Sequence, residues 1–348
     1  MKINTSHIGS PHPVYIIAEM SGNHNQSYDQ AVKIIEEAKK AGVNAIKIQT
    51  YTQDTLTIKS DKPYFKVGAG TLWEGKTLYD LYGEAFTPWE WQPKLMEVAR
   101  KLGLDFFSSP FDFTAVDFLE KMNVPAYKIA SFELIDLPLI ARVAKTGKPL
   151  IMSTGLANFA EINDAIVTAK TAGAKDIALL KCTSGYPALA EEMNLNTIPD
   201  LKNKTGCLVG LSDHTLGSAV PISAVALGAC IIEKHFTLSR KDPGPDSAFS
   251  LEPSEFTEMV NAIRTVEKSL GTIQYGPTEA EKKSLTFRRS LFVVEDIKAG
   301  ELLTEKNIRS IRPANGLPPK FYSEVLGKKA KANIEKGTPL TWDSIERT

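Results

Sequence analysis

Residues 14–50 read VYIIAEMSGNHNQSYDQAVKIIEEAKKAGVNAIKIQT. The apolar run at 14–20 predicts a buried strand, and the apolar residues at helical spacing over 29–42 predict an amphipathic helix. Gly42 follows that helix, where glycine commonly serves as a left-handed C-terminal cap. A second apolar run then spans 44–50. A strand, a helix and another strand in this order are typical of a parallel βαβ unit.

The same unit recurs along most of the chain. The predicted strands lie at 14–20, 44–50, 104–111, 126–133, 149–155, 176–184, 207–214 and 231–237. Strands that are apolar on both faces and alternate with helices belong to a parallel sheet covered by helices. Eight such units predict a (β/α)8 TIM barrel. An open doubly wound sheet is the alternative, but no GxGxxG motif follows the first strand. Thr87-Pro88-Trp89-Glu90 predicts a capping box at the start of a helix.

The composition of the chain changes after the last of these units. We expect the barrel over residues 1–271, a polar linker over 272–284 and a small β-rich domain over 285–348, where short apolar runs are broken by KAG, ANG and EKG turns. An insertion rich in Tyr, Lys, Gly and Trp spans about 51–86, between the second and third strands. A long βα loop on a barrel usually acts as a functional lid.

Charge and cysteine content limit the class of protein. The 348 residues include 41 Lys and Arg and 41 Asp and Glu, so the formal net charge is zero. This argues against a general nucleic-acid binder and against anchoring to acidic membranes. The chain has no apolar run long enough for a transmembrane helix and no signal-peptide pattern at its start. Three widely spaced cysteines suggest neither a disulfide framework nor a zinc motif, and we interpret Cys182 as a packing residue. We therefore expect a cytoplasmic protein.

Polar side chains stand at the carboxyl end of every predicted strand, where barrels have their active sites. His214 and His235 end neighbouring strands, so their imidazoles could share a divalent metal and leave positions open for substrate. Lys47, Lys128 and Lys181, with small hydroxyl side chains nearby, suit a phosphate or carboxylate ligand. The other polar residues at these ends are Glu19, Gln49, Ser108, Ser109, Ser131, Glu133, Ser153, Thr154, Thr183, Ser184, Ser212, Asp213, Glu233 and Lys234.

Several longer motifs resemble the sialic acid synthase family, which condenses phosphoenolpyruvate with an amino-sugar aldehyde. They include IAEMSGNHN (17–25), FSSPFD (107–112), YKIASFE (127–133), KCTSGYP (181–187), GLSDHT (210–215), EKHFTL (233–238), PGPDSAFSLEP (243–253) and RPANGLPPKFY (312–322). The tail resembles that family's SAF, or antifreeze-like, domain. Within the family the pattern is similar to the pseudaminic acid synthases in IAEMSGNHN, in the insertion GTLWEGKTLYDLYGEAFTPWEW (70–91) and in LPPKFY (317–322). Ser184 stands where the sialic acid enzymes usually have Asn, and this departure agrees with that branch.

This resemblance implies roles for individual residues. His214 and His235 would bind Mn²⁺ or Mg²⁺, and the catalytic residues would be Glu19, which directs water, with Lys128 and Glu133. The residues that would bind phosphoenolpyruvate or an N-acetylated amino sugar are Lys47, Gln49, Ser109, Ser131, Ser153, Ser184, Tyr186, Ser212, Asp246 and Arg312. The resemblance also implies a homodimer in which the tail of one subunit covers the barrel mouth of the other.

Other functions are compatible with the same residues. N-acetylneuraminate and legionaminate synthases use the same chemistry on a different sugar. A metal-dependent aldolase or isomerase would use the barrel without phosphoenolpyruvate. A noncatalytic sugar- or ice-binding module is a third interpretation. A pure binder, however, has no need for a metal at His214 and His235 together with a water-directing carboxylate at Glu19.

Overall fold

The structure is a computed structural model that describes residues 1–68, 70 and 72–346. The chain divides into two compact units, Met1–Gly271 and Thr272–Thr348. In the first unit, parallel strands close into a barrel in the order β10-β3-β4-β5-β6-β7-β8-β9, which confirms the predicted TIM barrel. The barrel strands are β3 (Tyr15–Glu19), β4 (Ala45–Thr50), β5 (Asp105–Pro110), β6 (Tyr127–Ile129), β7 (Leu150–Ser153), β8 (Ile177–Cys182), β9 (Leu208–Asp213) and β10 (Ile231–His235).

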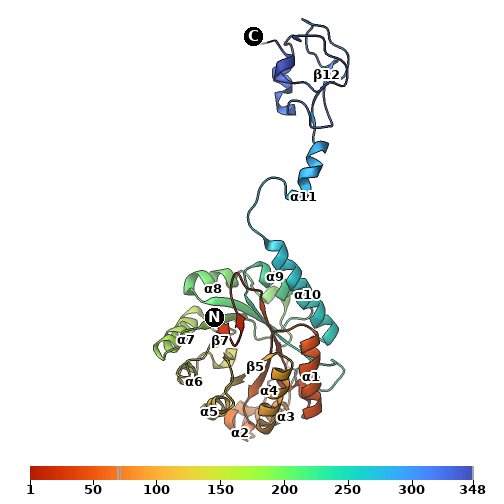
Figure 1. Ribbon diagram of the computed structural model, residues 1–348. Coiled ribbons are helices and arrows are strands. Elements are labelled where there is room, and N and C mark those ends of the chain that lie inside the picture. Colours follow the sequence, from red (N-terminus) through yellow and green to blue (C-terminus); the bar gives the residue numbers. More distant parts are fainter. Residues whose placement is uncertain (69, 71, 347–348) are drawn as a thin grey trace. The chain divides into compact units, whose positions relative to one another are not determined.

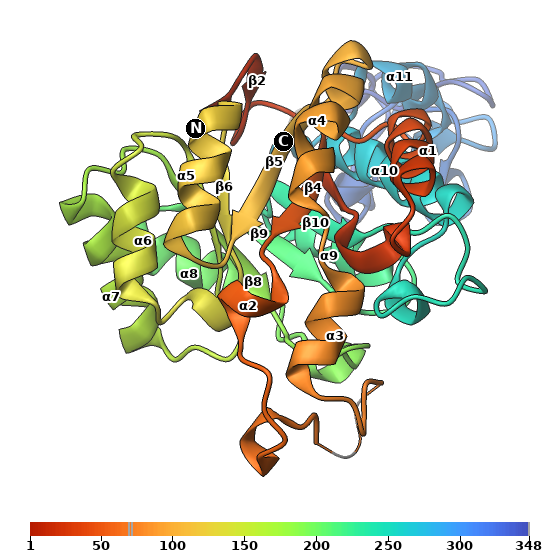
Figure 2. The same ribbon diagram turned by 90° about the horizontal axis from the view of Figure 1, so that it is seen from below.

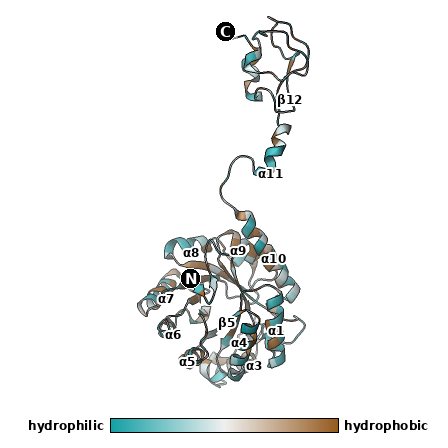
Figure 3. Cartoon of the chain, viewed as in Figure 1, coloured by the Kyte–Doolittle hydropathy of each residue, from teal (hydrophilic) through white to brown (hydrophobic). Residues whose placement is uncertain are grey.

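Helices surround the barrel on its outside (Figures 1 and 2). They are α1 (Tyr28–Lys40), α4 (Gln92–Lys101), α5 (Phe113–Met122), α6 (Leu137–Ala144), α7 (Phe159–Thr171), α8 (Thr197–Thr205), α9 (Ala219–Ala226) and α10 (Pro253–Leu270). Most of them mix hydrophilic and hydrophobic residues along their length (Figure 3). In α1, for example, Ala31, Ile34, Ile35 and Ala38 are buried at helical spacing. This packing of one apolar helix face on the sheet produces the large core of the barrel.

The register of β9 and β10 determines which polar side chains enter the barrel. Glu233 pairs with Ser212, and Lys234 pairs with Asp213. Because side chains alternate along a strand, the two pairs point to opposite faces. The Lys234 ammonium binds the Asp213 carboxylate and also donates to the Thr215 carbonyl at 2.5 Å, and both charged side chains are fully buried. An ion pair therefore joins β9 to β10 on the outer face, one residue before each of the two strand-end histidines.

The insertion after β4 contains two short helices, α2 (Gln53–Leu56) and α3 (Leu78–Ala85), which contact each other (Figure 2). The capping box predicted at Thr87 is wrong. A 3-10 turn covers Trp89–Trp91 and α4 begins only at Gln92, without a capping side chain. The Thr87 hydroxyl lies 3.1 Å from His24 Nε2 instead. The tertiary partner of Thr87 thus replaces the local bond that the sequence suggested.

The second unit contains an antiparallel pair, β11 (Ser290–Val293) with β12 (Ile308–Ile311), and the short helices α11 (Glu279–Lys282) and α12 (Tyr322–Val325). Its core is separate from that of the barrel and includes Leu291, Val293, Ile297, Leu303, Ile308, Leu317, Val325, Ala330, Ile334, Leu340 and Ile345. In the part of the chain that the structure describes, no helix is both long and apolar enough to cross a membrane.

Candidate active site

Two lysines and two carboxylates meet inside the barrel at the carboxyl ends of its strands. Lys47 Nζ lies 2.5 Å from Glu19 Oε2 and 3.8 Å from Glu233 Oε1. Lys128 Nζ, which comes from the opposite side of the barrel, lies 3.3 Å from the same Glu233 oxygen. Ser212 Oγ donates a hydrogen bond to that oxygen at 3.0 Å. Side chains from strands on opposite sides of a barrel can meet only in its interior. Glu233 binds lysines from two other strands there and is the centre of this network.

The two carboxylates of this network differ in basicity. Burial raises the pKa of Glu19, although Lys47 opposes the shift. Burial also disfavours ionisation of Glu233, but Lys128 and Lys47 outweigh it and lower the pKa of Glu233. Glu233 therefore remains the anion that compensates two buried lysines. Glu19 is the more basic group and the better candidate to accept a proton from water.

His214 and His235 lie side by side, with ring centroids 5.3 Å apart. His214 Nδ1 lies 3.1 Å from the Thr183 carbonyl and donates its proton to that oxygen, so Nε2 is the nitrogen that would bind a metal. His235 Nδ1 is buried and has no hydrogen-bond partner among the described residues. Burial, with His214 and nearby lysines, holds the pKa of His235 well below its usual value, so its imidazole is neutral. Two neighbouring imidazoles at the mouth of a barrel fit a divalent metal.

This metal site would have only two ligands from the protein. Within residues 1–68, 70 and 72–346, no group of three or more His, Cys, Asp and Glu side chains is arranged to hold an ion. Burial lowers the pKa of His214, but Cys182 and the Thr183 carbonyl outweigh it and raise that pKa overall. A metal here would therefore displace a proton and would need oxygen ligands from substrate or water.

Small residues from three consecutive βα loops form a cradle. Gly155 N donates to Ser131 Oγ at 3.2 Å. A Cβ atom added at Gly155 would lie 2.4 Å from Ser184 Oγ and 2.7 Å from Ser131 Oγ. The hydroxyls of Ser153 and Ser184 are buried without hydrogen bonds to any described residue. Buried hydroxyls that lack hydrogen-bond partners, next to the backbone of a glycine, indicate a site for a ligand with several acceptor oxygens.

A pocket of about 390 Å³ opens beside the histidines. Glu133, Tyr186, Asp246 and His235 line it, together with residues of the insertion. Burial raises the pKa of Glu133 to about 7 and also raises the pKa of Asp246. The Tyr186 ring lies 4.5 Å from the His214 ring. Three residues expected from the sequence to be catalytic or to bind substrate, Glu133, Tyr186 and Asp246, thus share one cavity with His235.

Most of the remaining expected residues lie near this network. Gln49 Nε2 donates to Glu19 Oε1 at 3.1 Å, and Lys47 Nζ lies 3.4 Å from Ser109 Oγ. Arg312 lies in the second unit and is exposed. Lys181 differs from the expectation, because its half-buried ammonium bonds to the Cys182 carbonyl and to the Thr183 hydroxyl. Cys182, not Lys181, is in register with inward-pointing Ser212, so Lys181 belongs to the other face of the strand.

Sequence reasoning undervalued two residues. The sequence analysis includes Glu233 only among the polar residues at strand ends, yet Glu233 binds both lysines. Its spacing of two residues from His235 could have placed it inside the barrel. Cys182 is interpreted as a packing residue in the sequence analysis, but its Sγ lies 3.8 Å from His214 Nδ1. Burial raises the pKa of the Cys182 thiol, and His214, Ser131 and Lys128 together bring that pKa down to about 7.

Comparisons with family models and with known proteins all match the chain to one family. The model of the NeuB family matches residues 34–275, and that of the SAF domain matches residues 288–346. The chain is 47% identical to the pseudaminic acid synthase of Helicobacter pylori over 338 residues, which cover 97% of this chain and 99% of that protein. It is 48% identical to a pseudaminic acid synthase of Campylobacter jejuni over 327 residues, which cover 94% and 95%.

A solved structure extends the likeness to both units. The spore coat polysaccharide biosynthesis protein SpsE of Bacillus subtilis is 32% identical, with a TM-score of 0.68. The match covers 100% of this chain and 99% of that one.

Proposed function

This chain belongs to the NeuB family of sialic acid synthases, and on that premise we propose that it is a pseudaminic acid synthase. The reaction would be a transferase reaction that condenses phosphoenolpyruvate with 2,4-diacetamido-2,4,6-trideoxy-altrose and water and releases phosphate. The observation that carries the proposal is the near 50% identity, over almost the whole chain, to proteins named for this activity. The network in the barrel supports it, because Lys47 and Lys128 lie close together there and would exchange a carboxylate of the protein for one of an anionic substrate.

The positions of the buried residues suggest which part of each substrate they would bind. Lys47, Lys128 and Gln49, with Ser109, would hold the carboxylate of phosphoenolpyruvate. The cradle of Ser131, Ser153 and Ser184 would hold its phosphate, and Ser212 would join them by exchanging its bond to Glu233. Glu133, Tyr186 and Asp246 would contact the sugar. The pocket beside the histidines would orient the open-chain aldehyde toward the methylene carbon of phosphoenolpyruvate.

Glu19 would direct the addition of water. After the carbon–carbon bond forms, positive charge develops at the former enol carbon, and Glu19 would accept the proton of the water that adds there. The raised pKa of Glu19 supports this role, because a more basic carboxylate takes that proton more readily. The cradle would then hold the phosphate as its carbon–oxygen bond breaks.

His214 and His235 would hold Mn²⁺ or Mg²⁺. His235 Nδ1, which has no hydrogen-bond partner in the part of the chain that the structure describes, and the neighbouring His214 ring fit such an ion. When bound, the ion would polarise the aldehyde oxygen as a Lewis acid.

We further propose a homodimer in the cytoplasm, with Arg312 of one subunit binding the N-acetyl group of sugar held by the other. Two observations support it. Residues 285–348 carry 12 basic and 8 acidic residues, a net +4, and the remainder carries 29 basic and 33 acidic, a net −4. Large apolar side chains are also exposed in the segments after successive barrel strands, namely Phe113, Phe132, Ile135, Leu156, Phe159, Leu189 and Leu216. The three free cysteines fit a reducing compartment.

Phosphate release tests the proposal directly. We expect release from phosphoenolpyruvate with the altrose-derived acceptor, and much slower release with N-acetylmannosamine or the legionaminate precursor. Turnover of N-acetylmannosamine but not of the altrose sugar would overturn the choice of sugar. No phosphate release with any aldehyde acceptor would instead favour an aldolase.

A further inference from the structure

Two loops at the barrel mouth meet at Ser21, a residue that the sequence did not predict for the site. Ser21 begins a short 3-10 helix, Ser21–His24, directly after β3. Asp246 precedes another, Ser247–Phe249, in the loop after β10. Ser21 is buried and has a positive φ of 44°, which residues other than glycine rarely adopt. Backbone positions of this kind occur often at functional sites.

The Ser21 hydroxyl connects residues that are expected to act on the two substrates. Gln49 Nε2 donates to Ser21 Oγ at 3.0 Å and to Glu19 Oε1 at 3.1 Å. Since Ser21 Oγ accepts this hydrogen bond, its own hydrogen is available to a second acceptor. Burial raises the pKa of Asp246, and a hydrogen bond from the Ser21 side chain opposes this shift. The residues Asp246, Ser21, Gln49 and Glu19 thus form a continuous series of hydrogen bonds, which we call the Ser21 chain.

The loop that carries Ser21 is also held in place by groups other than the hydroxyl. Asn23 Nδ2 donates to the Phe236 carbonyl and to Ser250 Oγ, both at 2.9 Å. Gly22 N donates to Asp246 Oδ2 at 3.3 Å. Removal of the Ser21 hydroxyl should therefore change the Ser21 chain and leave the loop where it is.

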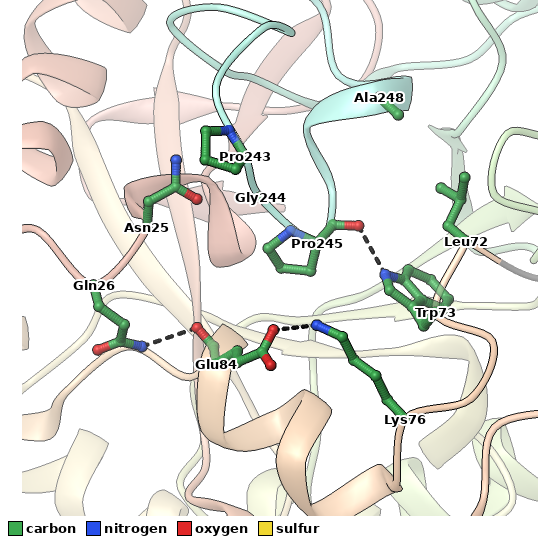
Figure 4. A pocket seen from close by; sticks show the side chains of 10 residues that line it. All are labelled: Asn25, Gln26, Leu72, Trp73, Lys76, Glu84, Pro243, Gly244, Pro245 and Ala248. Atoms are coloured by element: carbon green, nitrogen blue, oxygen red, sulfur yellow. Dashed lines mark hydrogen bonds and ion pairs between the residues drawn. The ribbon is translucent and has the colours of Figure 1, made fainter.

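The loop after β10 is packed closely between its neighbours. A Cβ atom at Gly22 would lie 2.7 Å from Pro245 Cγ, and one at Gly244 would lie 2.6 Å from Asn25 Oδ1. Figure 4 shows Asn25 beside Gly244, while Trp73 Nε1 donates to the Pro245 carbonyl at 2.8 Å from the other side. The backbone next to Asp246 is therefore fixed, and the hydroxyl of Ser21 has a defined partner.

We infer that Ser21 is a positioning residue that aligns the sugar contact Asp246 with the water-directing carboxylate Glu19. The inference rests on the proposed function, which gives those two residues their roles. Through Gln49, Ser21 would keep the sugar-binding side of the pocket in register with the carbon to which water adds. Small errors in the placement of reacting groups lower kcat more than they weaken binding.

Removal of the hydroxyl tests the inference. Ser21→Ala and Ser21→Gly both lack it, but only glycine adopts the positive φ without strain. In phosphate release with the altrose-derived acceptor, both variants should lower kcat by about 10- to 100-fold. The KM for each substrate should change by less than about threefold, a division that a general loss of structure would not produce.

Asn25→Gly is the matched control for the backbone. Asn25 lies in the same loop with a positive φ of 48°, but its side chain lines a separate outer cavity of about 550 Å³. This variant should therefore keep the kcat of the unaltered enzyme.

A double-mutant cycle tests the link between Ser21 and Gln49 independently of activity. Ser21→Ala and Gln49→Leu each break their shared hydrogen bond, so their losses of unfolding free energy in urea should sum to more than the loss in the double variant.

The possible outcomes separate the two proposals. An unchanged kcat in both Ser21 variants, an equal loss in Asn25→Gly, or strictly additive losses in the cycle would overturn the inference and leave the proposed function standing. Absence of phosphate release by the unaltered enzyme with every acceptor would overturn the proposed function and the inference with it.

Discussion

Replacement of Gly155 by Ala should block the serine cradle without changing any charge. The added methyl would lie 2.4 Å from Ser184 Oγ and 2.7 Å from Ser131 Oγ, whereas ordinary contacts of a Cβ atom begin near 3.4 Å. Both hydroxyls must therefore turn away from the space between them. Crowding of this kind costs about 1–3 kcal/mol of folding stability, which a domain of this size tolerates.

The effect on substrate binding should be larger than the effect on stability. A hydrogen bond to a charged group contributes about 1.5–3 kcal/mol, so loss of two serine hydroxyls from a phosphate would cost about 3–6 kcal/mol. Since about 1.4 kcal/mol corresponds to a factor of ten, kcat/KM for phosphoenolpyruvate should fall by about 10²- to 10⁴-fold.

Steady-state release of phosphate, with each substrate varied in turn, measures this effect. The KM for the sugar should change little, because Gly155 does not line the pocket that Glu133, Tyr186, Asp246 and His235 share. The matched control is the double variant Gly155→Ala with Ser184→Ala, which removes the closer clash and should regain stability without regaining affinity. An unchanged KM and kcat for phosphoenolpyruvate in folded Gly155→Ala would refute the assignment of the cradle to phosphate.

Four other predictions concern separate parts of the molecule. His235→Ala should abolish metal-dependent activity and leave the circular dichroism spectrum intact, because the ring stands at the barrel mouth. Burial raises the pKa of Glu133 from 4.5 to about 7, so its contribution to stability is full below about pH 4.5 and is lost as the pH rises through about 7. The free energy of unfolding in urea should therefore fall less over this window in Glu133→Gln. Lys234→Met should cost about 3–5 kcal/mol in urea unfolding because it leaves Asp213 buried without a cation, and adding Asp213→Asn should recover most of the loss. Arg312→Ala should raise the KM for the sugar more than the KM for phosphoenolpyruvate.

For each of these predictions, a specific experimental result would contradict it. Full activity of His235→Ala in chelated buffer would remove the metal role. Identical pH slopes with Glu and Gln at position 133 would show that this carboxyl does not titrate in the window. Strictly additive losses at Lys234 and Asp213 would mean that the two groups do not interact. A weaker affinity for phosphoenolpyruvate in Arg312→Ala would contradict the contact with the sugar.

The barrel itself was predictable because its signal is repeated. A strand with two buried faces, a helix and a glycine cap recur so regularly that errors at single positions do not change the result. Gly42, for example, has the positive φ of 86° that its place after α1 suggested. The Thr87 motif had no such repetition, and one contact with His24 was enough to override it.

The content of the site was predictable to the extent that it lies at strand ends. The two histidines and the lysines at positions 47 and 128 follow from that rule alone. The direction of each side chain needs the pleat and the register as well, which is why Lys181 was included and Glu233 was undervalued. The partner of Glu233 on the opposite strand depends on closure of the barrel, a long-range property that no local pattern contains.

The buried Lys234–Asp213 pair has a consequence for protein engineering. Each member directly precedes one of the two histidines, and the pair ties β9 to β10 from the side that faces away from substrate. The pair therefore fixes β9 and β10 relative to each other, and with them the spacing of the two proposed metal ligands. A designer who transfers only the histidines to another barrel would copy the proposed ligands without the ion pair that fixes their spacing. The smallest transferable unit is two dipeptides on adjacent strands, Asp213-His214 and Lys234-His235.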